Sequence, residues 1–163
     1  MQYTRYILLA IAMMLLQLLL FNNLHFLGIC HPFVYIIILL CLPMNLPRWG
    51  ELLIGAGVGL IADMVCSSPG VHTAACVLVS YLRPMLVSRM VQNAERLTDM
   101  VSGITVGKNV FLGLIGILIP IHHFVVFLLE YWSLSQFGWV LLATLLSSVL
   151  TIIIVTILDL INR

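Results

Sequence analysis

The stretch GVGLIADMVCSSPGVHTAA, residues Gly57–Ala75, places polar side chains and a tight turn inside a chain that is otherwise strongly apolar. The chain has 163 residues, of which 63% are hydrophobic and 8% are charged, and its mean hydropathy is +1.19. Soluble domains carry about 25% charged residues, so this composition predicts an integral membrane protein. The net charge of +1 gives no indication of nucleic-acid binding. A carboxylate inside a bilayer is costly, so Asp63 needs a structural or functional reason.

Six apolar segments are candidate membrane spans, since a helix needs about 20 apolar residues to cross the hydrocarbon core. They lie at about residues 6–24, 25–44, 50–66, 71–87, 109–131 and 138–161. The second segment is the weakest candidate, because Pro32 and Pro43 bracket only about ten apolar residues. It either starts earlier, near Leu24, or is broken inside the membrane. The predicted fold is an all-α integral membrane protein, a single transmembrane domain of six helices over residues 1–163.

The basic residues orient these spans, because short cytoplasmic loops hold an excess of Lys and Arg. With six spans and both termini in the cytoplasm, all seven Lys and Arg residues fall on the cytoplasmic side. A five-span topology without the second segment would move only Arg5 outside. We expect Arg83 to extend its charged end toward the inner surface. Apolar residues at helical spacing over about 87–101 predict a cytoplasmic amphipathic helix, packed on the bundle or docking a partner.

The glycines before Asp63 predict a close helix contact. Gly55 and Gly59 form a G-x-x-x-G pair, which lets a neighbouring backbone approach, from this protein or from a partner. Counted from Gly50, Asp63 lies about 20 Å along the helix, in the outer third of the membrane.

The turn after Asp63 supplies its candidate partners. Gly70 provides a positive φ for a tight external hairpin. His72 is the favoured partner across this turn, and Thr73 is the neutral alternative. A hydrogen bond or ion pair that holds the hairpin is favoured over catalysis or proton transfer.

All five histidines fall in the outer half of the predicted topology, which raises a second hypothesis. An outward polar pocket could bind a metal, a proton or a small ligand, and its candidate residues are Asp63, His72, His122, His123 and Glu130. Neither the histidines nor the four cysteines have metal-ligand spacing, so we predict no metal and no cofactor. No nucleophile–base arrangement or phosphate-binding loop is present in the sequence, so we predict no enzymatic activity.

Three stretches of the chain resemble the rod shape-determining protein MreD family. They are LLQLLLFNNL in the first span, HPFVYIIILLCLP with PRW after it, and GVGLIADMVCSSPGVHTAACVLVSYLRP. The last, a glycine–aspartate stretch followed by a Pro-Gly turn, is the most specific, whereas the half after Val101 matches only in character. The length and the six predicted spans also agree with the family.

The resemblance implies a function and a set of partners. Members of this family are multi-pass proteins of the bacterial inner membrane that help to maintain elongated cell shape. They associate with the single-span protein MreC and, through the elongation complex, with the actin-like MreB and the peptidoglycan synthases. Their six-helix arrangement is similar to that of the substrate-binding membrane subunits of vitamin-uptake transporters. The resemblance carries no catalytic residues over to this chain, and Gly59, Asp63 and Gly70 are motif positions only.

Overall fold

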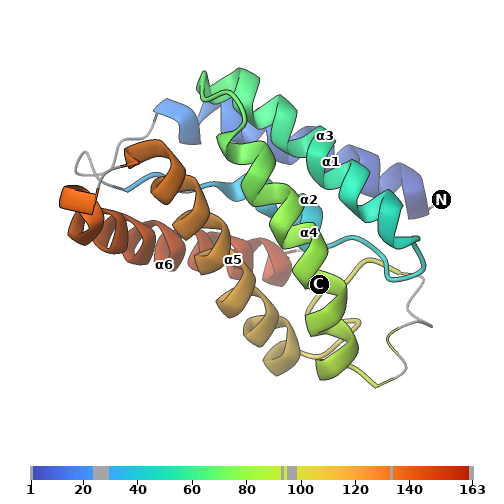
Figure 1. The fold of residues 1–163 in the computed structure, drawn as a ribbon. Helices are drawn as coiled ribbons and strands as arrows, with labels where there is room; N and C mark the ends of the chain where they lie inside the picture. The colour runs from blue at the N-terminus through green and yellow to red at the C-terminus, as the bar shows by residue number, and fades with distance from the viewer. Residues whose placement is uncertain (1, 24–29, 93, 95–98, 133, 162–163) are drawn as a thin grey trace.

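The computed structural model describes residues 2–23, 30–92, 94, 99–132 and 134–161. Within these ranges the chain is a helical bundle without a β-strand (Figure 1). The long helices are α1 (Gln2–Leu19), α3 (Arg48–Cys66), α4 (Val71–Met90), α5 (Lys108–Tyr131) and α6 (Phe137–Ile161). The short helical turns are η1 (Phe21–Asn23), η2 (Val34–Ile36), α2 (Ile37–Leu40) and η4 (Leu134–Gln136).

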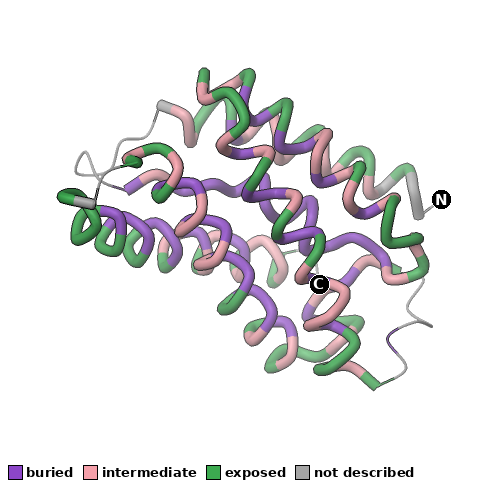
Figure 2. Tube along the Cα trace, viewed as in Figure 1, coloured by how far each residue is buried: buried purple, intermediate pink, exposed green. Residues whose placement is uncertain are grey.

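Four of the helices, α3 to α6, are long and apolar enough to cross a membrane, and α1 adds a shorter apolar stretch, Tyr6–Leu19. Large hydrophobic side chains are exposed along the outside of the bundle, where Figure 2 shows exposed residues alternating with buried ones. On α6 they include Leu141, Leu145, Val149, Ile153 and Ile157. Such a surface is unfavourable in water and ordinary in lipid. The prediction of an all-helical, membrane-embedded protein is confirmed at this level.

The long helices pack in chain order, α3 against α4, α4 against α5 and α5 against α6. The first helix, α1, instead packs against η2 and α2, which lie inside the bundle (Figure 1). Every residue from Val34 to Leu42 is at least 93% buried. The interior is therefore built around a short segment rather than around a sixth long helix.

This central segment supports the broken form among the two alternatives for the predicted second span over residues 25–44. Its described part, residues 30–44, is helical only in η2 and α2, and residues 24–29 lie outside the described ranges. Gln17, near the end of α1, accepts a hydrogen bond from Val34 N (2.8 Å). Tyr6, near the start of α1, donates to Ile38 O (2.9 Å). The segment therefore runs antiparallel to α1.

The ends of the short turns η2 and α2 leave backbone groups of the central segment without helical partners. Such groups are tolerated at membrane depth only inside protein. Side chains of α1 and α4 supply those partners.

The α3–α4 hairpin contains the predicted close contact. A Cβ atom at Gly59 would collide with the backbone of Thr73, and one at Gly55 would collide with the Ser80 side chain. The helix that these glycines receive is therefore α4 of the same chain. The turn between the helices has left-handed backbone at Ser67 (φ 55°) and Gly70 (φ 87°).

The region after α4 differs from the expected amphipathic helix over about 87–101. Helix α4 continues through Pro84 to Met90, and Val91 then adopts an extended conformation. Residues 99–101 are not helical, and residues 93 and 95–98 lie outside the described ranges. A proline inside a helix removes only one backbone N–H donor, and neighbouring protein can compensate for that loss in a membrane helix.

Candidate functional site

Asp63 caps the start of α4. Its carboxylate accepts hydrogen bonds from the backbone N–H groups of Gly70 (3.0 Å), His72 (2.8 Å) and Thr73 (3.1 Å). The Thr73 hydroxyl donates a further bond of 2.6 Å. The first N–H groups of a helix have no intrahelical acceptor, and the positive end of the helix dipole favours a negative charge there. The side chain of Asp63 thus joins α3 to α4 across the hairpin.

The predicted contact between Asp63 and His72 is made by the backbone of His72 and not by its ring. Thr73, the neutral alternative, provides the side-chain hydrogen bond. The ring of His72 instead places Nδ1 2.7 Å from the hydroxyl of Tyr35 in the central segment. An Asp63–His72 side-chain pair is therefore not formed.

Tyr35 and the two rings that it bridges form the centre of what we call the histidine cluster: His72, Tyr35, His122, Cys76 and Phe33. The Tyr35 hydroxyl lies 3.0 Å from His122 Nε2, and Cys76 Sγ lies 3.8 Å from the same nitrogen. The Phe33 ring packs edge-on against His72, with 4.9 Å between centroids. All five residues are at least 93% buried. His122 Nδ1 is buried and has no hydrogen-bond partner among the residues that the structure describes.

His123 belongs to a different contact, between α5 and α6. Its Nδ1 lies 2.9 Å from Ile119 O, and its Nε2 lies 3.2 Å from the Thr151 hydroxyl. The two neighbouring histidines therefore have different hydrogen-bond partners, but both rings pack against Phe33 of the central segment, with centroid distances of 6.0 Å for His122 and 5.3 Å for His123.

Three of the five candidate residues of the expected outward pocket come together, since His72, His122 and His123 all pack against Phe33. Asp63, His72, His122 and His123 are buried in internal contacts, and Glu130 is exposed on α5. His25 lies outside the described residues. A cavity of about 490 Å³ lies elsewhere, between α1, the central segment, the 99–105 loop and the last turns of α6. Across the described ranges, no group of three or more His, Cys, Asp or Glu side chains is placed to hold a metal ion.

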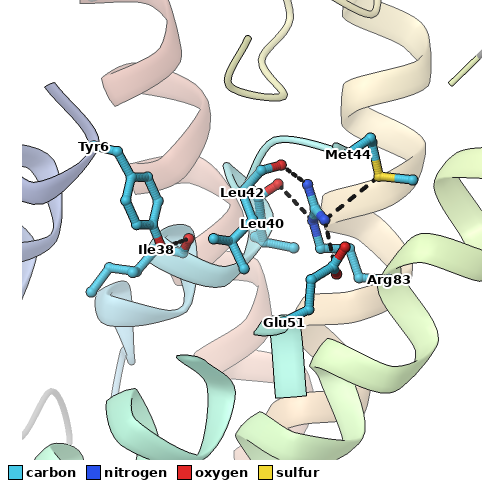
Figure 3. Close-up of polar contacts among 7 residues, drawn as sticks. All are labelled: Tyr6, Ile38, Leu40, Leu42, Met44, Glu51 and Arg83. Carbon is cyan, nitrogen blue, oxygen red and sulfur yellow. Dashed lines mark hydrogen bonds and ion pairs between the residues drawn. The ribbon is translucent and has the colours of Figure 1, made fainter. Parts of the chain in front are cut away.

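The second polar site, the arginine cluster, consists of Arg83, Glu51, Leu40, Leu42 and Met44 (Figure 3). The Arg83 guanidinium forms an ion pair with Glu51 Oε2 (3.2 Å). It also donates from Nε to Leu40 O (3.1 Å) and from Nη2 to Leu42 O. Nη1 lies 3.6 Å from Met44 Sδ. Arg83 is fully buried and Glu51 is 2% exposed.

The arginine cluster corrects the expectation that Arg83 extends to the membrane surface. The carbonyl groups at the end of α2 have no helical donors, and the planar guanidinium carries several donors in a fixed geometry that can satisfy two of them. Glu51 balances the charge, because a buried cation is strongly unfavourable without a partner.

The site residues predicted from the sequence do not include Glu51, Tyr35 or Gln17. For Glu51 a signal was available, since it begins one helix of a hairpin and Arg83 lies near the end of the other, at a similar depth. Tyr35 and Gln17 gave no comparable signal, because their partners are groups of a central segment that was expected to be helical.

Comparison with known proteins adds no assignment: no family model, no curated protein and no solved structure matches this chain.

Proposed function

We propose that this protein is a non-enzymatic membrane scaffold of the MreD type. In this proposal it lies in the bacterial inner membrane, binds a single-span partner of the MreC type, and supports elongation-specific peptidoglycan synthesis through the complex that contains MreB and the synthases. The chain crosses the membrane six times with both termini in the cytoplasm, and the central segment provides the second crossing.

The observation that supports this proposal is that the buried polar side chains bond to other parts of the same chain. Asp63 accepts four short hydrogen bonds within its own hairpin. Arg83 is occupied by Glu51 and by two backbone carbonyl groups. Neither side chain lines the 490 Å³ cavity. Buried polar groups that hold helices of the same chain together support a structural role rather than a chemical one.

The sequence motifs supply the specific part of the proposal. The most specific motif, GVGLIADMVCSSPG, forms the end of α3 and the turn that Asp63 caps. In this proposal, loss of the hairpin disrupts the packing of the scaffold and its binding to partners, and no catalytic step is involved.

The experiment is complementation in a rod-shaped bacterium that lacks its own MreD. Wild-type protein should restore rod shape and should recover the MreC-type partner in a detergent pull-down. Asp63→Leu should fail in both assays, while Glu130→Gln, a change at an exposed acid, should behave as wild type. Normal shape together with normal partner recovery for Asp63→Leu contradicts the proposal.

The alternative is a small-molecule-binding or transport subunit with an outward-facing pocket. Four of the five residues expected to line that pocket are buried in internal contacts instead. A binding subunit should gain thermal stability from its ligand, whereas a scaffold should gain it from its protein partner. Thermal unfolding with and without the purified partner therefore separates the two functions.

A further inference from the structure

The hydrogen bonds of the histidine cluster restrict where its protons can be. The Tyr35 hydroxyl has one proton to donate, and it lies within hydrogen-bond distance of His72 Nδ1 (2.7 Å) and His122 Nε2 (3.0 Å). A neutral imidazole has one N–H donor and one bare acceptor nitrogen. Tyr35 can therefore donate a hydrogen bond to one ring only, while it accepts a hydrogen bond from the other.

Two neutral arrangements satisfy this rule. In the first, Tyr35 donates to His72 Nδ1 and His122 Nε2–H donates to Tyr35, so His122 Nδ1 is a bare acceptor. In the second, all of these bonds are reversed and His122 Nδ1 carries a proton. The same atom is without a partner in both arrangements, although the residue is fully buried. A buried polar atom left unpaired needs an explanation, and water or a functional role is the usual one.

We propose that His122, Tyr35 and His72 form a buried proton-binding relay, in which His122 Nδ1 is the site that takes up a proton. This function goes beyond scaffolding and does not depend on it. A proton delivered by water binds His122 Nδ1, and the Nε2 proton of His122 passes to the Tyr35 oxygen. The hydroxyl proton of Tyr35 passes at the same time to His72 Nδ1, and His72 then releases its Nε2 proton to water. One proton enters and one leaves, and each group is neutral before and after.

The surroundings favour His72 as the ring that holds the charge between these steps. The carboxylate of Asp63 on α3 bonds to the backbone of His72 (2.8 Å). Near His122 the titratable neighbours are Cys76 on α4 and His123 on α5, and neither is an anion that would stabilise an imidazolium.

The experiment is a histidine ¹⁵N NMR titration of the wild-type protein in phosphatidylcholine vesicles, from about pH 8 to about pH 5. The relay requires His72 and His122 to change protonation over the same pH interval, because one proton is shared between them. Tyr35→Phe keeps the ring and removes the hydroxyl, so the two midpoints should separate by about one pH unit or more. Tyr6→Phe, at the tyrosine that bonds Ile38 O, should leave the shared interval unchanged.

Three results overturn the relay. The first is that the two rings titrate independently in the wild-type protein, and the second is that neither titrates in this range. The third is that stoichiometric Zn²⁺ shifts both rings and remains bound after desalting, which makes the cluster a metal site. The wild-type titration decides the first two even if Tyr35→Phe does not fold.

Discussion

The arginine cluster and the histidine cluster hold the same central segment, but with different electrostatics. In the arginine cluster a full positive charge meets a full negative charge, and the spare donors bind Leu40 O and Leu42 O. In the histidine cluster the contacts join neutral groups around the Tyr35 hydroxyl, and His122 Nδ1 is left over. In the arginine cluster the charged groups are paired with each other, whereas in the histidine cluster His122 Nδ1 has no partner among the described residues. A saturated charged site suits fixed structure, whereas an unsaturated neutral site can change its protonation.

Arg83→Met gives the largest expected effect, because it breaks the arginine cluster and leaves both Glu51 and two carbonyl groups without donors. Removing one partner of a buried ion pair costs about 3–5 kcal/mol. The measurement is the free energy of unfolding in detergent micelles titrated with a denaturing detergent. Arg89→Met, at an exposed arginine of the same helix, should change this free energy by less than about 0.5 kcal/mol.

The double variant Glu51→Leu/Arg83→Met sharpens the comparison. It removes the uncompensated charge, so it should be more stable than Arg83→Met alone. It should not regain wild-type stability, since Leu40 O and Leu42 O still have no donors. Equal stability of the single and double variants would mean that leaving Glu51 buried without Arg83 carries no cost.

The Asp63 cap is the charged feature closest to the histidine cluster. Asp63→Leu removes the side-chain acceptor of the Gly70, His72 and Thr73 backbone N–H groups, and losing a helix cap typically costs about 1–2 kcal/mol. Asp63→Asn keeps one acceptor oxygen at the same place, so it should lose less. The same unfolding measurement ranks the two. If Asp63→Asn proves as damaging as Asp63→Leu, the negative charge matters more than the hydrogen bonds.

The sequence was sufficient for the features that depend on local pattern. Apolar runs locate α3 to α6, and the G-x-x-x-G pair and the Pro-Gly turn locate the hairpin around Asp63. It was not sufficient where tertiary contacts override local preference. The run FVYIIILL favours one long helical span, but it forms only the short turns η2 and α2, and Gln17 and Arg83 bond the backbone groups at their two ends. Nothing in the run itself encodes those partners.

The α3–α4 hairpin is also held by a close backbone contact at Gly59, which can be tested separately from the polar clusters. A methyl group at Gly59 would collide with the backbone of Thr73, whereas Gly57 has open space around its Cα. Gly59→Ala should therefore destabilise the bundle by about 1–3 kcal/mol through overpacking. Gly57→Ala is the matched control, and it should be neutral or slightly stabilising because alanine is the better helix former. A similar change in stability for the two variants would show that the close contact at Gly59 does not stabilise the bundle.

Tyr35→Phe and Tyr6→Phe compare the two tyrosines of the central region directly, and Tyr6→Phe should have the smallest effect of these variants. Tyr35→Phe leaves His72 Nδ1 and His122 Nε2 without their shared partner, which should cost about 1–3 kcal/mol. Tyr6→Phe leaves only Ile38 O, which is part of a helical turn, and should cost about 0.5–1.5 kcal/mol. Thermal unfolding in vesicles ranks them. If Tyr35→Phe costs less than Tyr6→Phe, the two rings have found other partners, and the histidine cluster is then a loosely packed core rather than a connected hydrogen-bond chain.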